Sequence, residues 1–194
     1  LVVGVSSCVK GCSNGGDQPA ADQNQIDSRV AAGVTDELTN RFKTELDRNE
    51  KLAQIAANAN AYDDTSLLEL ALDVPESIDF VANYPNAQKS GQAYSDAVSK
   101  GTAPELYDWD IRWGAVAYGE HPLAVSGSGP TAFSMAYMGL TGSADKTPAD
   151  MAALASGQNF ATGDSGTDGA FFEAAAEGLG LQVKSHESSS ANLT

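Results

Sequence analysis

The chain has 194 residues, 42% of them hydrophobic, which is enough for one sizeable core but too few for two full domains. It carries 11 basic residues against 26 acidic ones, a formal net charge of -15. Because this charge repels phosphate backbones, and no basic stripe with interleaved aromatic residues interrupts it, we expect no nucleic-acid partner.

Residues 1–25 are predicted to form a lipoprotein-like, flexible tether. The segment opens on LVVGVSSC, in which apolar residues lead into small ones and then into Cys8, as in a bacterial lipobox. Polar residues and glycines follow, typical of a linker. Two alternatives stay open: a short buried strand over Leu1–Val5, and a local disulfide between Cys8 and Cys12. The lipobox predicts an extracellular or cell-surface protein, lipid-anchored through Cys8.

Neither cysteine is expected to bind a metal. Cys8 and Cys12 lie four residues apart, with no second cysteine pair and no matching histidines, which does not make a zinc site. We therefore expect no metal and no cofactor. No later segment is apolar over the roughly 20 residues that a membrane-spanning helix needs.

Residues 26–100 are predicted to be a helical N-terminal region. Apolar residues recur every four positions at its start, the pattern of one long amphipathic helix. These residues are Ile26, Val30, Val34, Leu38, Phe42 and Leu46. The stripe of Leu52, Ile55, Ala56 and Ala59 predicts a second helix. Since such stripes usually mark packing, this region is expected to carry no chemistry.

Two short helices and a loop are expected next. Thr65 or Ser66 can cap the first helix, and Pro75 followed by Glu76 suits the first turn of the second. The second should end at Tyr84-Pro85-Asn86, and residues 86–106 should form a connecting loop.

The stretch with chemical potential is VSGSGPTAFSMAYMGLTG, residues 125–142. Pro130 fits the first turn of a helix, which places Ser128 at or just before the helix N-terminus. Serine is a favoured cap, and a serine nucleophile needs a base within hydrogen-bond distance. From spacing alone, Ser128 is therefore either a helix cap in a glycine-rich turn or a nucleophile.

Two further helices are predicted after this stretch. The segment TPADMAALAS should be a helix capped by Thr147, with Pro148 in its first turn. The segment DGAFFEAAAEGLGLQVKS should be a helix that stops at Gly178 or Gly180 and turns into a strand from Leu181. A strand followed by the polar HESSSANLT suggests that the polypeptide continues, or was cut, at Thr194.

Five segments between residues 62 and 183 resemble the bacterial C39-like family of papain-like cysteine peptidases, in the same order and with similar separations. The segments are LLELALDVPESIDFVANYP, DWDIRWGAVAYG, AVSGSGPTAFSMAYMGLTG, TPADMAALA and GTDGAFFEAAAEGLGL. The resemblance implies an α+β, papain-like cysteine peptidase fold with a helical N-terminal extension. Residues 101–194 would be its nucleophile-bearing half, and the sheet half would only begin in this chain.

The resemblance assigns catalytic positions to Ser128 and Asp108. The family has its nucleophilic cysteine where Ser128 stands, and a glutamine of the oxyanion hole where Asp108 stands. A carboxylate donates no hydrogen bond unless protonated, and its charge opposes a developing oxyanion. The family's tryptophan after Gly-Thr is also absent, since Asp168 and Gly169 follow instead. Positions that match the family pattern are Asp110, Arg112, Trp113, Tyr118 and Gly119.

The family's catalytic histidine, and the Asp or Asn that orients it, lie in the C-terminal sheet half. The two histidines here, His121 and His186, both stand outside the expected sequence context. The resemblance therefore implies a partner: a C-terminal half carrying these residues, as a continuation or as a separate cleaved chain.

Two functions follow. The first is a cell-surface C39-like cysteine peptidase or related amide hydrolase acting on peptides or proteins, inactive as it stands because Ser128 replaces cysteine. The alternative is a non-catalytic peptide-binding module on the same scaffold, which Asp108 favours. A purely helical adhesive protein is a third interpretation, against which the five segments argue.

Overall fold

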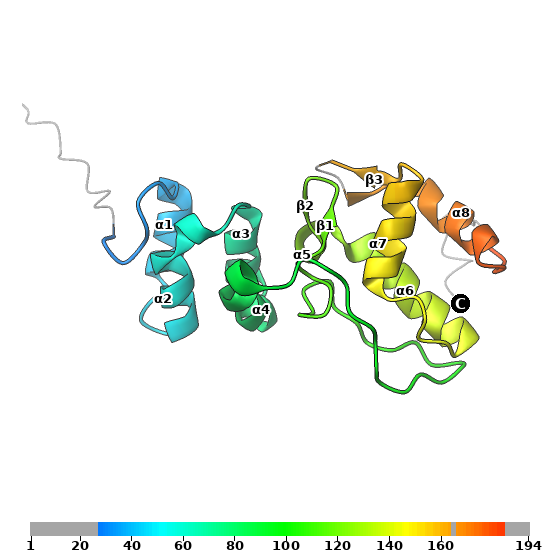
Figure 1. Ribbon diagram of the computed structural model, residues 1–194. Coiled ribbons are helices and arrows are strands. Elements are labelled where there is room, and N and C mark those ends of the chain that lie inside the picture. Colours follow the sequence, from blue (N-terminus) through cyan, green and yellow to red (C-terminus); the bar gives the residue numbers. More distant parts are fainter. Residues whose placement is uncertain (1–26, 164–165, 185–194) are drawn as a thin grey trace, which may run out of the picture.

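The computed structural model describes residues 27–163 and 166–184, which form a mixed α+β structure with about half of the chain in helices (Figure 1). The helices are α1 (Asp36–Lys43), α2 (Glu50–Ala57), α3 (Ser66–Asp73), α4 (Ile78–Asn83), α5 (Leu123–Ser126), α6 (Ser128–Thr141), α7 (Pro148–Gly157) and α8 (Ala170–Gly178). Short 3-10 turns are η1 (Ala59–Ala61), η2 (Pro75–Ser77) and η3 (Tyr84–Asn86).

The strands of the described residues are two residues long and pair as antiparallel hairpins. They are β1 (Ala117–Tyr118) with β2 (His121–Pro122), and β3 (Ala161–Thr162) with β4 (Gly166–Thr167). Across residues 27–163 and 166–184 these hairpins do not join into a larger sheet. The sheet half that the family resemblance implies is therefore not formed by this part of the chain.

The prediction of one long helix from residue 26 to residue 46 is wrong, and α1 covers only its middle. Gly33 has a φ of +93°, which helices do not contain, and Thr35 is extended and accepts a hydrogen bond from the N–H of Leu38 as the N-cap. The apolar pattern nevertheless identified core positions. Val30, Leu38, Phe42 and Leu46 are buried, whereas Ile26 lies outside the described residues.

The short helices that follow agree with the sequence prediction. Thr65 occupies the N-cap position of α3, but it is Asp64 whose side chain accepts the hydrogen bond from the N–H of Ser66. Pro75 opens the turn η2 that leads into α4, and η3 ends this helical region. The loop expected over residues 86–106 is present, because no helix or strand forms between η3 and β1.

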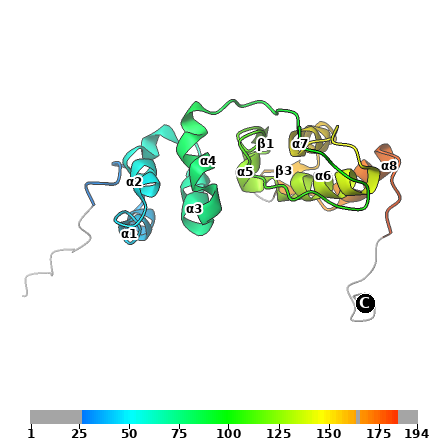
Figure 2. The ribbon, with the colours of Figure 1, turned by 90° about the horizontal axis from the view of Figure 1, so that it is seen from below.

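Buried side chains form two clusters. The first lies among α1 to α4 and includes Ala115 and Ala124, so the segment that leads to α6 packs against the helical region. The second lies around α6, α7 and α8, where Met138, Met151 and Phe171 are fully buried. Figures 1 and 2 both show α6 and α7 side by side, with α5 between them and the α3–α4 pair.

Local signals at α7 and α8 are confirmed, but the strand expected at 181–184 is wrong. Thr147 and Asp150 form a reciprocal capping box at the start of α7. After α8, Gly180 takes a φ of +72°, and the N–H of Leu181 donates to the carbonyl of Ala176 at 2.7 Å. This is a Schellman motif, which uses the Leu181 amide to close the helix and leaves residues 181–184 irregular.

Candidate functional site

Ser128 is the first residue of α6, as the sequence predicted. Gly127 is the N-cap, and Pro130 lies in the first turn, where its missing N–H costs no helical hydrogen bond. The Ser128 side chain is exposed, and α6 continues for 14 residues without a charged side chain. The unpaired N–H groups and the helix dipole at this end favour negative charge.

The glycines beside Ser128 are required by close contacts. A Cβ atom at Gly127 would lie 2.4 Å from the carbonyl oxygen of Leu123, and one at Gly129 would lie 2.6 Å from Oγ1 of Thr167. Both distances are shorter than real Cβ contacts allow. Thr167 belongs to β4, and its Oγ1 also lies 2.6 Å from the hydroxyl of Tyr118 on β1. The start of α6 is thus packed against β4, which in turn contacts β1 through Thr167 and Tyr118.

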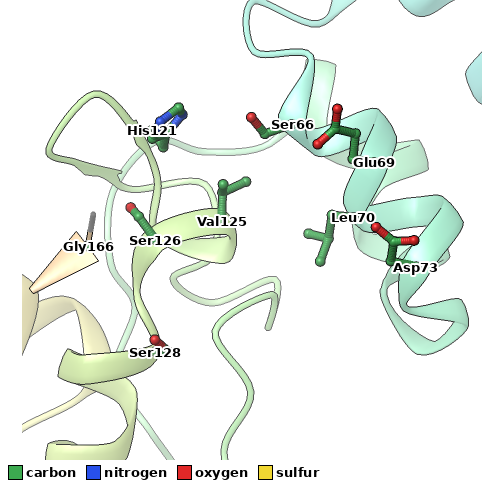
Figure 3. Close-up of a pocket in the computed structure, with 9 residues that line it drawn as sticks. All are labelled: Ser66, Glu69, Leu70, Asp73, His121, Val125, Ser126, Ser128 and Gly166. Carbon is green, nitrogen blue, oxygen red and sulfur yellow. The ribbon is translucent and has the colours of Figure 1, made fainter. Parts of the chain in front are cut away.

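Ser128 opens onto a cavity of about 430 Å³ between two walls (Figure 3). One wall is helix α3, which contributes Ser66, Glu69, Leu70 and Asp73. The other wall consists of His121, Val125, Ser126, Ser128 and Gly166. The helical N-terminal region, which was expected to serve packing alone, therefore forms half of the cavity.

Helix α3 has an apolar side and a polar side, and the polar side contributes the charged residues of this wall. Leu67, Leu68 and Ala71 face the core of the helical region. Glu69 and Asp73 are one turn apart on the exposed side of the same helix. That polar side is indistinguishable from an ordinary solvent-exposed face until α5 and α6 are placed opposite it.

His121 lies on β2 and pairs with a residue far away in the sequence. Its Nδ1 atom is 2.7 Å from Oδ2 of Asp64, across 57 residues. Burial alone raises the pKa of the Asp64 carboxyl, but hydrogen bonds from His121 and from the Ser66 backbone bring that pKa below its usual value. The carboxylate is thus held in its charged form.

The structure does not bring His121 and Ser128 together as a base and a nucleophile. Figure 3 shows them at opposite ends of the cavity, with Ser126 between them. The Ser126 hydroxyl donates to the carbonyl of Tyr118 at 3.0 Å and is thus engaged with the backbone. The second histidine of the sequence, His186, lies outside the described residues.

Asp108, at the oxyanion-hole position of the resemblance, does not line this cavity. It is partly buried in the loop before β1, and burial raises its pKa to about 6, although the N–H groups of Asp108 and Trp109 oppose the rise. Its backbone carbonyl lies so close to Gly114 that a Cβ there would approach it to 2.9 Å. At pH 7 Asp108 is therefore mostly a carboxylate with acceptors only.

The residues that match the family pattern around Asp108 hold this loop in place. Arg112 donates to both carboxylate oxygens of Asp110 and lies over the rings of Tyr94 and Trp113. The indole N–H of Trp113 donates to the carbonyl of Tyr107 at 2.7 Å. These contacts fix the loop, but none of them reaches the cavity.

No metal site or membrane span is found in the part of the chain that the structure describes. Within residues 27–163 and 166–184, no three His, Cys, Asp or Glu side chains gather as ligands. Over the same residues, no helix has the length and apolar character needed to cross a membrane. Cys8, Cys12 and the predicted lipobox lie outside the described residues.

Comparisons with family models, with curated proteins and with solved structures found no match to the chain. The papain-like interpretation therefore depends on the five sequence segments and on the position of Ser128.

Proposed function

We propose that the chain is the nucleophile-bearing part of a papain-like, C39-like hydrolase scaffold whose cavity takes a peptide, with Ser128 at the nucleophile position. The observation that carries the proposal is the exposed side chain of Ser128 at the first position of α6, facing a cavity of about 430 Å³. A cavity of this size suits a few side chains of an extended peptide.

The chemistry of the helix N-terminus supports this position for a thiol. There, a cysteine loses its proton more easily, because the N–H groups and the dipole stabilise the thiolate. A serine hydroxyl starts far less acidic and needs a hydrogen-bonded base. Since His121 lies at the other end of the cavity, we expect the protein with Ser128 to be nearly inert toward peptide amides.

The missing base implies a partner. We propose that the catalytic histidine and its orienting Asp or Asn come from a C-terminal sheet half, which residues 27–163 and 166–184 do not contain. Part of α6 is accessible to such a half at Met135, Ala136 and Leu140, and Leu140 is 58% exposed.

The lipobox segment further supports a cell-surface location. Labelling with a radioactive fatty acid tests this location, because Cys8→Ala should abolish incorporation of the label.

A second candidate function is peptide binding without cleavage, and Asp108 favours it. With a pKa of about 6, this carboxyl is mostly ionised at pH 7 and repels an oxyanion that comes near it. In this alternative Ser128 and Asp108 are both native residues, and the cavity that Ser128 lines holds a peptide without cutting it.

The test uses Ser128→Cys in a background with Cys8→Ser and Cys12→Ser, and peptides that carry a thiol-reactive electrophile. Ser156→Cys is the matched control, because Ser156 is also exposed and helical but lies in the last turn of α7. For each variant, the relative rate is the labelling rate with a peptide reagent divided by the rate with iodoacetamide. We expect this relative rate to be many-fold higher for Ser128→Cys than for Ser156→Cys. Equal relative rates for the two variants would contradict a peptide-binding cleft at Ser128.

Turnover separates the two candidates. A peptidase scaffold predicts that Ser128→Cys hydrolyses peptides once the sheet half is supplied, and that adding Asp108→Gln raises the rate further if Asp108 occupies the place of a needed donor. A binding module predicts labelling by the peptide reagents without hydrolysis in any of these variants.

A further inference from the structure

The two walls of the cavity at Ser128 differ in electrostatic character. Ser128 begins the 14-residue helix α6, so this wall carries the positive end of a helix dipole. The facing wall is α3, which contributes the carboxylates of Glu69 and Asp73 (Figure 3). None of the described residues that line the cavity is a lysine or an arginine. A ligand in the cavity therefore meets positive potential at Ser128 and carboxylates on the α3 wall.

The two carboxylates differ in how far their charge is matched. Asp73 forms an ion pair with Arg41 of α1, so its charge is compensated within the helical region. The side chain of Glu69 has no hydrogen bond or ion pair with any residue that the structure describes. His121, which lines the other wall and becomes cationic only when protonated, pairs with Asp64. The unmatched negative charge on the described walls is therefore that of Glu69.

Apolar surface accompanies these charges. Leu70 of α3 and Val125 of α5 line the same cavity, and each is half-buried. Lysine and arginine side chains combine an aliphatic stem with a charged head, so they can contact apolar surface and a carboxylate together. A small cation would use the carboxylate alone, and an acidic side chain would be repelled by it. The cavity is thus suited to a long basic side chain.

We propose that the cavity at Ser128 selects peptides that carry a lysine or arginine side chain, and that Glu69 pairs with the charged head of this side chain. The peptide carbonyl lies at the start of α6, the aliphatic stem contacts Leu70 and Val125, and the charged head reaches the α3 wall. The inference rests on the proposed function, since it names the class of peptide that the same cavity takes.

The test uses the Ser128→Cys protein without Cys8 and Cys12 and three peptide reagents that differ only in the residue next to the electrophile. This residue is lysine, norleucine or glutamate; norleucine keeps an aliphatic stem without the charge. Each labelling rate is divided by the rate with iodoacetamide. At low salt we expect the lysine reagent to label about threefold faster than the norleucine reagent, and the glutamate reagent to label more slowly than both. Added salt should reduce these differences.

Three further substitutions in this protein test the role of Glu69. Glu69→Gln should abolish the preference for lysine over norleucine. Glu76→Gln is the matched control, because Glu76 is also exposed but does not line the cavity, and it should keep the preference. This control separates a local effect from the net charge of -15, which both substitutions change equally. Arg41→Gln should increase the preference, because it leaves Asp73 unmatched.

Circular dichroism verifies that each variant is folded. The proposal is refuted if the lysine and norleucine reagents label the parent equally, if the preference survives in Glu69→Gln, or if Glu76→Gln loses it to the same extent. An unchanged preference in Arg41→Gln would contradict the charge balance that singles out Glu69.

Failure of this proposal is distinguishable from failure of the proposed function. If all three peptide reagents label Ser128→Cys equally fast, and faster than Ser156→Cys, the proposed function stands and the selectivity is refuted. If none labels Ser128→Cys faster than Ser156→Cys, the proposed function fails. Two small thiosulfonate reagents, one bearing a trimethylammonium group and one a sulfonate, then test Glu69 without any peptide. Glu69→Gln should lower the cationic-to-anionic rate ratio more than Glu76→Gln does, and equal ratios would refute the role of Glu69.

Discussion

Replacing Gly129 by alanine perturbs the residue that follows Ser128 and tests how tightly the start of α6 is packed. The added Cβ would lie 2.6 Å from Oγ1 and 2.8 Å from Cβ of Thr167, so β4 or the helix must shift. Overpacking of this kind costs about 1 to 3 kcal/mol. Alanine in place of a helical glycine returns about 0.5 to 1 kcal/mol. The difference lies between about 0 and 2.5 kcal/mol, and we expect Gly129→Ala to lower the free energy of unfolding by about 1 kcal/mol.

The assay is urea unfolding followed by tryptophan fluorescence, since Trp113 is buried in the core around α6. Gly157→Ala is the control, because a Cβ at this position in α7 meets nothing within 4 Å. It should be neutral or stabilising by up to about 1 kcal/mol. In a double variant with Thr167→Gly, the cost of Gly129→Ala should shrink, because the clashing atoms are removed. If Gly129→Ala were as stable as Gly157→Ala, the packing argument for the glycines beside Ser128 would fail.

The remaining predictions concern a titrating group and a helix cap. Burial raises the pKa of Asp108 to about 6 in the folded protein, above the usual value of 3.8, so the contribution of this one group to stability should be greatest at low pH and fall as pH rises from about 4 to about 7. Asp108→Asn should remove this part of the pH dependence in urea unfolding from pH 4 to pH 8, and an unchanged profile would contradict the assignment. Thr147→Ala should cost about 1 kcal/mol through loss of the capping box of α7, whereas Ser156→Ala in the exposed last turn should cost almost nothing. Equal melting temperatures for these two variants would show that the cap contributes no stability.

The starts of α6 and α7 could be predicted from the sequence, because nearby residues determine where a helix begins. Pro130 placed the start of α6, and Thr147 with Pro148 placed the start of α7. Each of these signals acts within one helical turn, so no knowledge of the rest of the chain was needed.

The errors arose where backbone conformation or long-range contacts decided the outcome. The apolar period of residues 26–46 marked core positions, but the conformations of Gly33 and Thr35 make the helix begin only at Asp36. At Gly180 the same type of backbone conformation closed α8 and removed the predicted strand. Gly180 was expected to end the helix, but the sequence did not show that the N–H of Leu181 would be used to close it.

Only part of the candidate site could be predicted from the sequence. The position of Ser128 came from its neighbours, whereas the α3 wall and the pairing of His121 with Asp64 depend on residues 57 positions apart. Asp108 was expected near the nucleophile because of the resemblance, yet it does not line the cavity. Contacts at such separations follow from how the elements pack together, which no local pattern encodes.

The most direct test of the central claim is the pKa of the thiol introduced by Ser128→Cys, measured from the pH dependence of iodoacetamide alkylation without Cys8 and Cys12. A thiol at the first position of α6 should have a pKa about one unit or more below the ordinary value of about 8.5. The same measurement on Ser156→Cys, at the opposite end of a helix, should give a pKa of about 8.5 or higher. Equal pKa values for the two thiols would contradict the claim that Ser128 occupies a nucleophile position.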